Sequence, residues 1–383
     1  MKFPVYLDNH ATTQIDPVVL QDMMPWLTEN YGNPSSRSHS FGWMAEEAVK
    51  YAREISAEML GVQPDELYFT GGATESNNTV LRGLTERKPS GKDHLICTKV
   101  EHSSVLKVFR YLEMRGWRVT YLDVDIHGQI DPEQLEQEIT DKTLLVSVQA
   151  ANNEIGTIYP VEKIADICHR HSCLFHTDAA QAIGKTPLNL AGSEIDFMSM
   201  SAHKIYGPKG IGLLYVKNRR PAISLTPLLI GGGQEGGLRS GTHNVPGIVG
   251  LASALRLIFA NMEQECHRIA QLRDRLYEKL NSRLDNVHLN GPLTDRLPNN
   301  LNVSFSGTDI SRLLAAIRNV AVSTGSACAS VSASPSHVLE AIGLDEKLKK
   351  CSLRFGLGKF NTEEEIDYAA QTVAEAVRSS SII

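Results

Sequence analysis

The feature that most constrains the fold of this chain is a series of short apolar segments separated by longer stretches with helical or turn character. Apolar runs of this length are typical of buried strands, and their alternation with helices predicts a mostly parallel sheet covered on both faces. The last run follows its predecessor closely, so we expect it to pair antiparallel. The seven segments are ELYFT (66–70), HLICTKV (94–100), RVTYLDV (118–124), LLVSVQA (144–150), CLFHTDAA (173–180), IDFMSMSA (195–202) and IGLLYVKN (211–218).

A long helix is predicted before the first of these strands. It ends at Gly61, which can adopt the left-handed conformation of a helix C-cap. Apolar residues recur along it at helical spacing, and they predict one buried face made of Met44, Ala48, Ala52, Ile55 and Met59.

The last third of the chain has a different pattern and predicts a smaller α+β domain. A long amphipathic run at 247–284 links it to the large domain, and residues 299–305 are predicted to form a strand. Residues 309–317 and 362–377 are predicted to be helical, and a further helix starts at Ser334-Pro335 and ends before Gly343. We therefore expect a large α/β domain over 15–262 and a small domain formed by 1–14 and 263–383.

Composition excludes several classes of function. The formal charge of −6 and the absence of a long Lys/Arg run argue against nucleic-acid binding. The N-terminal segment lacks the apolar core of a signal peptide, and no stretch approaches the roughly 18 apolar residues of a membrane helix. Six cysteines are too few for a disulfide framework. We expect a cytoplasmic protein with reduced thiols and no membrane contact.

The segment CHRHSC (168–173) raises the possibility of a metal site. Cys168 falls on a predicted amphipathic helix with Ile164, and Cys173 opens the following strand, so the side chains of this segment should diverge. The spacing of Cys168, His169, His171 and Cys173 matches no common zinc pattern. No metal site is predicted.

Polar residues follow several predicted strands at their carboxyl ends, where parallel α/β sheets bind ligands. GGATESNN (71–78) places Thr74 at the start of a helix, which is either an ordinary cap or a phosphate seat. Asp178 can cap a helix or hold a protonated ring nitrogen, and Lys204 can be a surface charge or a Schiff-base lysine. Together the three would meet the needs of pyridoxal 5′-phosphate.

Nine motifs in order extend this interpretation over nearly the whole chain. They are YLDNHATT, GNPSSRSH, FTGGATESNN, EHSSVL, NNEIG, HTDAAQAIGK, SAHKIYGPKGIGLLYV, RSGTHNVP and STGSACAS. In this order the chain resembles the NifS/IscS-type cysteine desulfurases, which are fold type I pyridoxal phosphate enzymes of the class V aminotransferase-like branch. The resemblance implies a large domain with a seven-stranded, mostly parallel sheet and a smaller α+β domain.

The resemblance also assigns residues around the cofactor ring. It implies that Lys204 holds the cofactor covalently, that Asp178 partners the pyridine nitrogen and that Gln181 bonds the phenolic oxygen. His102 would stack on the ring and transfer protons. The phosphate would be bound by Ala73, Thr74, Ser201 and His203, and by Thr242 from the partner subunit of a homodimer with a shared active site.

The substrate implied by the resemblance is L-cysteine. Asn153 and Arg354 would bind its carboxylate, since a planar guanidinium suits a bidentate grip. Cys328 lies among small residues in STGSACAS (323–330), on a loop of the longer, mobile type, and would attack the substrate sulfur. The products would be L-alanine and a persulfide on Cys328. The other five cysteines receive no catalytic role.

The sulfur would pass to an iron–sulfur scaffold or another acceptor, for cluster assembly, transfer-RNA thiolation or thio-cofactor synthesis. The chain ends at Ile383, without the further tail that helps related enzymes dock a scaffold. The sequence leaves three alternatives. A class V aminotransferase would not need Cys328, whereas a selenocysteine lyase could use the same residues. A non-catalytic relative would not need Lys204, His102 and Cys328.

Overall fold

A seven-stranded sheet forms the centre of the molecule. The computed structural model describes residues 2–87, 91–324 and 336–381. The strand order is β2-β8-β7-β6-β5-β3-β4, and all neighbours are parallel except β8, which is antiparallel to both β2 and β7. The seven predicted strands are all present, as β2 (Leu67–Thr70), β3 (His94–Thr98), β4 (Arg118–Leu122), β5 (Thr143–Ser147), β6 (Leu174–Asp178), β7 (Phe197–Ser201) and β8 (Gly212–Val216).

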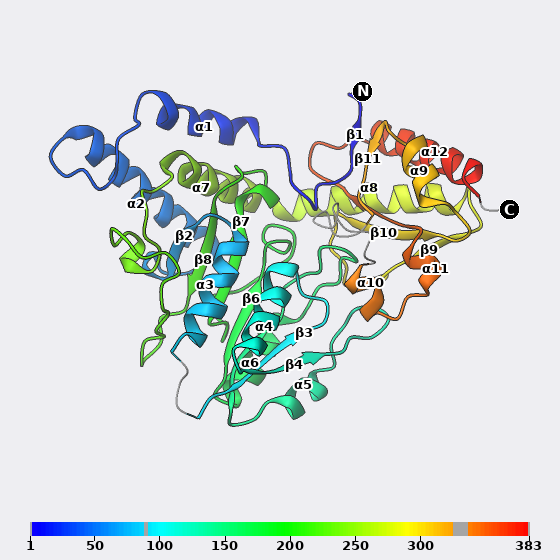
Figure 1. Ribbon diagram of the computed structural model, residues 1–383. Helices are drawn as coiled ribbons and strands as arrows, with labels where there is room; N and C mark the ends of the chain where they lie inside the picture. The colour runs from blue at the N-terminus through cyan, green and yellow to red at the C-terminus, as the bar shows by residue number, and fades with distance from the viewer. Residues whose placement is uncertain (1, 88–90, 325–335, 382–383) are drawn as a thin grey trace.

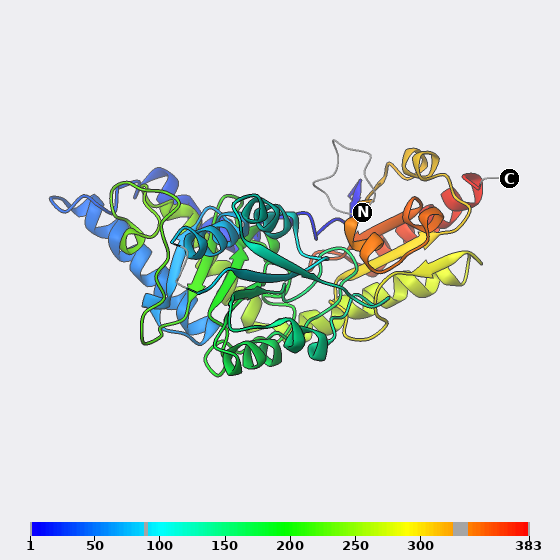
Figure 2. The same ribbon diagram turned by 60° about the horizontal axis from the view of Figure 1, so that its bottom comes forward.

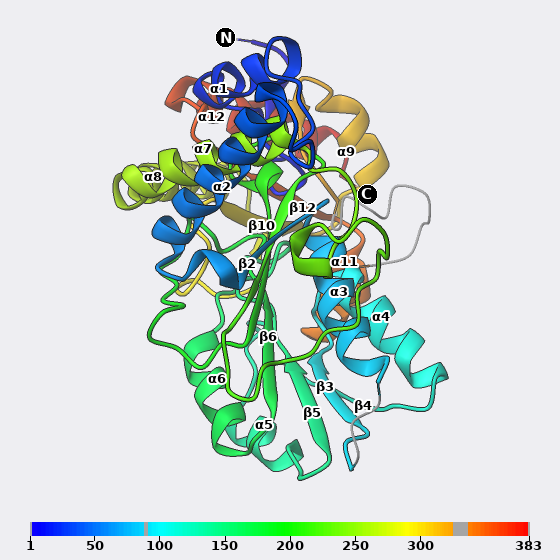
Figure 3. The same cartoon turned by 90° about the vertical axis from the view of Figure 1, so that its left-hand side faces the viewer.

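Helices cover both faces of this sheet, which explains why its strands are apolar throughout. Every residue of β3, β5, β7 and β8 is buried. Figure 3 shows α3 and α4 on one side of the sheet and α5 and α6 on the other. The covering helices and those beside them are α1 (Pro17–Thr28), α2 (Ser40–Leu60), α3 (Ala73–Thr85), α4 (Ser103–Met114), α5 (Pro132–Glu138), α6 (Val161–Arg170) and α7 (Val245–Ala260).

The C-terminal part forms a second, smaller sheet of antiparallel strands with its own helices. Its sheet has the order β12-β10-β9, and a short parallel pair joins β1 to β11. The helix α8 runs from the first sheet to this part (Figure 1). The elements are β1 (Val5–Tyr6), α8 (Met262–Asn281), β9 (Val287–Leu289), β10 (Asn300–Phe305), α9 (Ile310–Ala316), β11 (Val320–Ala321), α10 (His337–Ala341), α11 (Glu346–Lys349), β12 (Ser352–Gly356) and α12 (Glu363–Ser379).

The apolar core is divided in the same way, between the large sheet and the C-terminal part. Two clusters lie on the faces of the large sheet. A third cluster joins residues 5 and 7 to residues between 269 and 377, so the N-terminal segment packs with the C-terminal elements. In Figures 1 and 2 the N-terminal helices (blue) and the C-terminal elements (orange to red) lie at opposite ends of the molecule.

Two local predictions need correction. α2 ends at Gly61 in the left-handed conformation as expected, but Met44 is exposed, and Ala48, Ile55 and Met59 are only partly buried. Its buried side is shifted because α2 packs on α7, and that side is made of Gly42, Ala45, Val49, Ala52, Ser56, Ala57 and Leu60.

The predicted run at 247–284 is two helices rather than one continuous element. α7 and α8 meet at Asn261 at an angle of 76°. The predicted helix start at 334–335 lies outside the described residues. The helix itself is present as α10, which begins at His337 under a cap from Ser336 and ends before Gly343 as expected.

No single helix within the described ranges is long and apolar enough to cross a membrane. α7 and α8 reach the necessary length and composition only as a bent pair, and most of α7 is buried in the protein core.

Candidate active site

A cavity of about 780 Å³ lies beyond the carboxyl ends of the parallel strands. This is where the topology of an open α/β sheet favours ligand binding. Asp178 ends β6 and Ser201 ends β7, and these strands are neighbours in register, with Asp178 opposite Ser199. Ten predicted site residues line the cavity: Ala73, Thr74, His102, Asn153, Asp178, Gln181, Ser201, His203, Lys204 and Arg354.

Lys204 lies in a short turn that follows β7 directly. Its amino group donates hydrogen bonds to the backbone carbonyl oxygens of Ala11, at 2.7 Å, and His10. Both acceptors belong to the N-terminal segment, which also lines the cavity. These two carbonyl oxygens hold the amine at the cavity wall, where it is placed to react with a ligand that carries a carbonyl group.

The Asp178 carboxylate is buried, with 6% of the residue exposed. One oxygen accepts the Asn77 side-chain N–H at 2.7 Å, and the other accepts the Ala180 backbone N–H at 3.0 Å. The Asn77 oxygen itself is buried and has no hydrogen-bond partner among the described residues. A carboxylate fixed in this way, with no cation paired to it in the part of the chain that the structure describes, suits a protonated ring nitrogen.

His102 caps the start of α4 through its Nδ1 atom, which accepts the backbone N–H of Ser104 at 3.2 Å. The Ser104 hydroxyl lies 2.8 Å from the same nitrogen and in turn accepts a bond from Asn77 at 2.8 Å. Burial lowers the pKa of His102, which favours the neutral ring. Since Nδ1 accepts, the proton of that ring lies on Nε2.

Asn77 and Ser104 were not predicted as site residues. They join Asp178 and His102 into one chain of hydrogen bonds from α3 and α4. Both lie inside motifs that the sequence does display, FTGGATESNN and EHSSVL. The motifs thus contained a signal for them, but nothing local indicated that the two residues meet.

The start of α3 provides a seat for a phosphate group. Gly72 precedes the helix with φ 143°, a conformation that side chains rarely adopt, and a Cβ there would lie 3.5 Å from the Ser201 hydroxyl oxygen. Gly72 supplies no side-chain cap, so the helix dipole and the first-turn N–H groups are available to an anion. His203 faces the same cavity, and burial with the nearby Lys204 charge lowers its pKa to about 4.

Arg354 lies on β12 and is 1% exposed, yet its guanidinium lines the cavity. Nη2 pairs with a carboxylate oxygen of Asp8 at 3.0 Å, and Nη1 donates to the Asn153 backbone oxygen at 3.1 Å. The buried Nε has no partner among the described residues. Asp8 was not predicted as a site residue, although it lies in the motif YLDNHATT. A ligand carboxylate that binds Arg354 would therefore bind a guanidinium that is already paired with Asp8.

Two predicted site residues are not part of this lining. Thr242 is exposed on the loop before α7, outside the cavity of its own chain. Its predicted role is in the site of a partner subunit, and this stays a prediction. Cys328 lies outside the described residues. Of the other cysteines, Cys97, Cys168, Cys173 and Cys351 are buried and Cys266 is partly buried.

The side chains of the CHRHSC segment lie in two places, and the two cysteines, which were expected to diverge, are hydrogen-bonded to each other. Cys168 and Cys173 are buried in the core. His171 pairs with Glu136 at 2.9 Å, and His169 lies beside Glu194 at 3.3 Å, so both imidazoles lie among surface groups.

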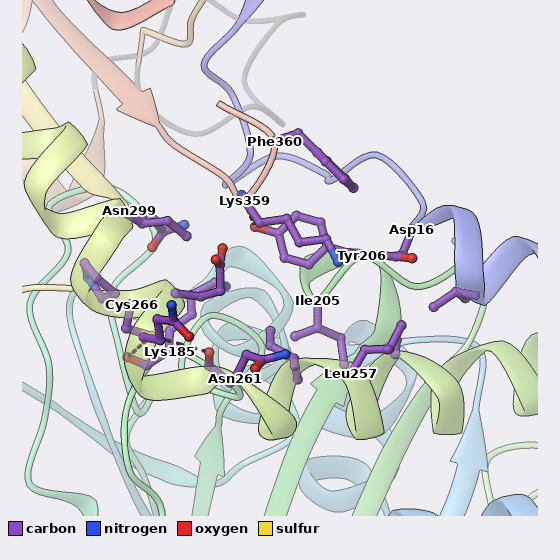
Figure 4. A pocket seen from close by; sticks show the side chains of 18 residues that line it. Asp16, Lys185, Ile205, Tyr206, Leu257, Asn261, Cys266, Asn299, Lys359 and Phe360 are labelled. Atoms are coloured by element: carbon purple, nitrogen blue, oxygen red, sulfur yellow. Dashed lines mark hydrogen bonds and ion pairs between the residues drawn. The ribbon is translucent and has the colours of Figure 1, made fainter. Parts of the chain in front are cut away.

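A second cavity, of about 370 Å³, lies where α7 and α8 meet the loops of the C-terminal part (Figure 4). As far as the described residues show, it shares none of the predicted site residues. The Lys185 amino group donates to the backbone oxygen of Gln181 at 3.1 Å, and burial together with Lys204 lowers the pKa of Lys185 to about 7. Through Gln181 this cavity adjoins the first one.

The residues of the first cavity fit pyridoxal 5′-phosphate. The ligand has a phosphate, a ring nitrogen, a ring oxygen and a carbonyl group. The corresponding protein groups are the uncapped start of α3, the buried carboxylate of Asp178, the amide of Gln181 and the amine of Lys204. Within the described residues, the buried Asn77 oxygen and the Arg354 Nε are left for a ligand to bind.

Comparisons with known proteins agree with this geometry. Residues 5–369 match the aminotransferase class-V family. Cysteine desulfurase IscS of Rickettsia typhi is 47% identical over 98% of this chain and 92% of its own length, and the Ehrlichia chaffeensis IscS is 48% identical over 99% and 92%.

Solved structures give the same result. A NifS-like protein superposes with a TM-score of 0.91 at 40% identity, covering 98% of this chain and 99% of that one. SspA in complex with cysteine superposes with a TM-score of 0.83 at 39% identity, covering 94% and 100%.

Proposed function

The chain belongs to the aminotransferase class-V family and to its cysteine desulfurases, and from this premise we propose that it converts L-cysteine to L-alanine with Cys328 as the sulfur-accepting nucleophile. The enzyme depends on pyridoxal 5′-phosphate. The observation that carries the residue roles is the convergence of Lys204, Asp178 and His102 on one cavity at the strand ends.

The cofactor, when bound, withdraws electrons from the α-carbon of the amino acid that it carries. Lys204 would hold its carbonyl group, and the Lys204 amine would take the proton from the substrate Cα atom. Asp178 would keep the ring nitrogen protonated, and His102 would lie against the ring and carry protons at Nε2. Arg354 and Asn153 orient the substrate carboxylate.

Cys328 is the residue that accepts the sulfur of the substrate. Its thiolate attacks the substrate sulfur, a sulfur–sulfur bond forms, and the bond between that sulfur and Cβ breaks with its electron pair going to carbon. Protonation of that carbon completes the L-alanine skeleton. We propose that the resulting persulfide passes its outer sulfur to an acceptor protein for iron–sulfur cluster assembly or for thiolation of a cofactor or transfer RNA.

We propose that the active unit is a homodimer. The support is a group of exposed apolar side chains on α1, α2 and the loop between them, because large groups of this kind mark interaction surfaces. They are Leu20, Met24, Leu27, Tyr31, Phe41, Trp43, Met44 and Tyr51. In such a dimer Thr242 would complete the phosphate seat of the partner. The domain limits 15–262 and 1–14 with 263–383 also remain our proposal, and cytoplasmic location is a prediction.

The test of the proposed function is paired measurement of alanine and sulfide from L-cysteine in the presence of a thiol reductant. We expect equal yields. Lys204→Ala should abolish turnover, whereas Cys328→Ser should keep the yellow cofactor and lose sulfide release. Normal sulfide release by Cys328→Ser would rule out the persulfide step, and alanine formed only from pyruvate and an amino donor would indicate an aminotransferase.

A further inference from the structure

The imidazole of His10 lies in the wall of the candidate active site, between the side chains of Gln181 and Asn300. The residue is 1% exposed and lines the cavity. Its Nδ1 atom is 3.0 Å from the side-chain oxygen of Gln181, and its Nε2 atom is 3.1 Å from the Asn300 side-chain nitrogen on β10. Its backbone oxygen also accepts bonds from the Gln181 side chain, at 3.0 Å, and from Lys204.

The neighbours of Asn300 fix the positions of the protons. Its side-chain oxygen accepts a bond from the Arg296 guanidinium at 3.0 Å, and its nitrogen also donates to the Glu154 backbone oxygen at 3.0 Å. The amide therefore turns its N–H side toward His10, so Nε2 of His10 must accept. The proton of the neutral imidazole then lies on Nδ1 and is donated to Gln181.

This arrangement determines whether the N–H or the carbonyl group of the Gln181 side chain is turned toward the cavity. The amide oxygen is engaged by the His10 ring, and one N–H is engaged by the His10 backbone oxygen. The second N–H has no acceptor among the described residues, while Gln181 lines the cavity. A flipped amide would place its oxygen against a negatively charged ring oxygen of the ligand.

We propose that His10 is a positioning residue: its ring holds the Gln181 amide so that an N–H, rather than the carbonyl, is presented to the ring oxygen of the cofactor. The inference rests on the proposed function, because the ring oxygen belongs to the bound cofactor. It adds a residue outside those predicted from the sequence to hold the cofactor.

The surroundings of His10 keep the ring in this state. Burial lowers the pKa of His10 well below its ordinary value. Arg354 is the main charged group that faces the ring and opposes a second proton there, and the Lys185 and Lys204 amines add to its effect whenever they are protonated. A protonated ring would place two N–H groups against each other at Asn300, so the single-proton form is required throughout the working pH range.

The experiment is a pH titration of the visible absorption of the cofactor-loaded enzyme. A hydrogen bond to the ring oxygen stabilises negative charge there and so favours loss of the proton from the Lys204–cofactor linkage. Without the bond, the midpoint should rise by roughly half to one pH unit in His10→Ala and in Gln181→Ala. The double variant should show no further rise, since both residues act on one bond.

Two further variants separate positioning from mere structure. His10→Asn places an amide N–H near the position of Nδ1 and should restore the wild-type midpoint. His94→Asn removes another buried histidine, which bonds Thr143 and Thr120 away from the cavity, and should leave the midpoint unchanged.

The inference is overturned if His10→Ala titrates like the wild type while Gln181→Ala does not, or if their effects add. It is also overturned if His10→Asn fails to rescue while remaining folded and loaded. Failure of the proposed function has a different signature. A normal visible band without alanine and sulfide from L-cysteine would refute the desulfurase activity alone, whereas a wild type that takes up no cofactor would refute both.

Discussion

At the scale of single residues, Glu101 stands out because its carboxyl group is fully buried beside the site. Its carboxyl is buried directly before His102, where one oxygen accepts bonds from the Thr98 hydroxyl at 2.8 Å and the Gln149 backbone N–H at 3.0 Å. The other oxygen is buried without a partner among the described residues. Burial raises the pKa of Glu101 to about 8, so the folded protein keeps this group as a neutral acid at pH 7.

We predict that Glu101→Gln changes the pH dependence of stability. In the wild type the folded chain retains a proton that the unfolded chain loses between pH 4.5 and about 8, so the contribution of Glu101 to stability falls as pH rises through this window. Glutamine has no proton to lose. The variant should therefore gain in melting temperature over the wild type at about pH 9 and match it more closely at about pH 5.

Thermal unfolding at the two pH values checks this prediction. Glu58→Gln is a suitable control, because Glu58 is exposed on α2. A gain for Glu101→Gln that is equal at both pH values would show that Glu101 is ionised in the folded protein.

At the scale of elements, the closing helix α12 shows how local sequence fixes a boundary. The Thr362 hydroxyl accepts the Glu365 backbone N–H at 3.2 Å, and the Glu365 carboxylate accepts the Thr362 N–H at 3.3 Å, which is a reciprocal capping box. Its apolar face packs with α8 in the C-terminal core. The helix thus starts where two side chains satisfy its free N–H groups.

Thr362→Ala removes this cap and should lower the free energy of unfolding by about 1 kcal/mol. Chemical denaturation measures the change, with Glu364→Gln in the same first turn as the control. Turnover should be unchanged, because neither residue lines the active-site cavity. A loss no greater than that of the control would contradict the capping assignment.

At the scale of the whole molecule, the active site draws on both parts of the chain. Asp178 ends β6 and Lys204 follows β7 of the large sheet. Arg354 lies on β12 of the small sheet, and His10 belongs to the N-terminal segment. α7 and α8 form a single bent connection at 76°. The shape of the cavity therefore depends on how the large sheet packs against the C-terminal part.

The proposed dimer gives a prediction at the same scale. The double variant Met24→Glu/Trp43→Glu places two charges among the apolar side chains of α1 and α2, where Trp43 is 55% exposed in the single chain. Burying unpaired charge is costly, so we expect a monomer by light scattering and weaker retention of the cofactor. Met114→Glu is the control, because Met114 is 79% exposed at the end of α4. A double variant that remains dimeric would exclude this surface as the interface.

Much of the fold could be predicted because it depends on local pattern. The seven strands of the large sheet are continuous apolar runs, and β8 follows β7 closely enough to require an antiparallel partner. The position of Gly61 also followed from the sequence. The buried face of α2 did not, because α2 packs on α7 and leaves Met44 exposed. Periodicity identifies a helix but does not say which neighbour will cover it.

The sequence by itself determined the order of the elements, the family motifs and the residue types at the strand ends. Only the tertiary structure decided which of those residues meet. His10 bonds Gln181 across 171 positions and Asn300 across 290, and Arg354 pairs with Asp8 across 346. Such contacts carry no local signal, because hydrogen-bond partners and proton positions are set by the packing of elements that are distant in the chain.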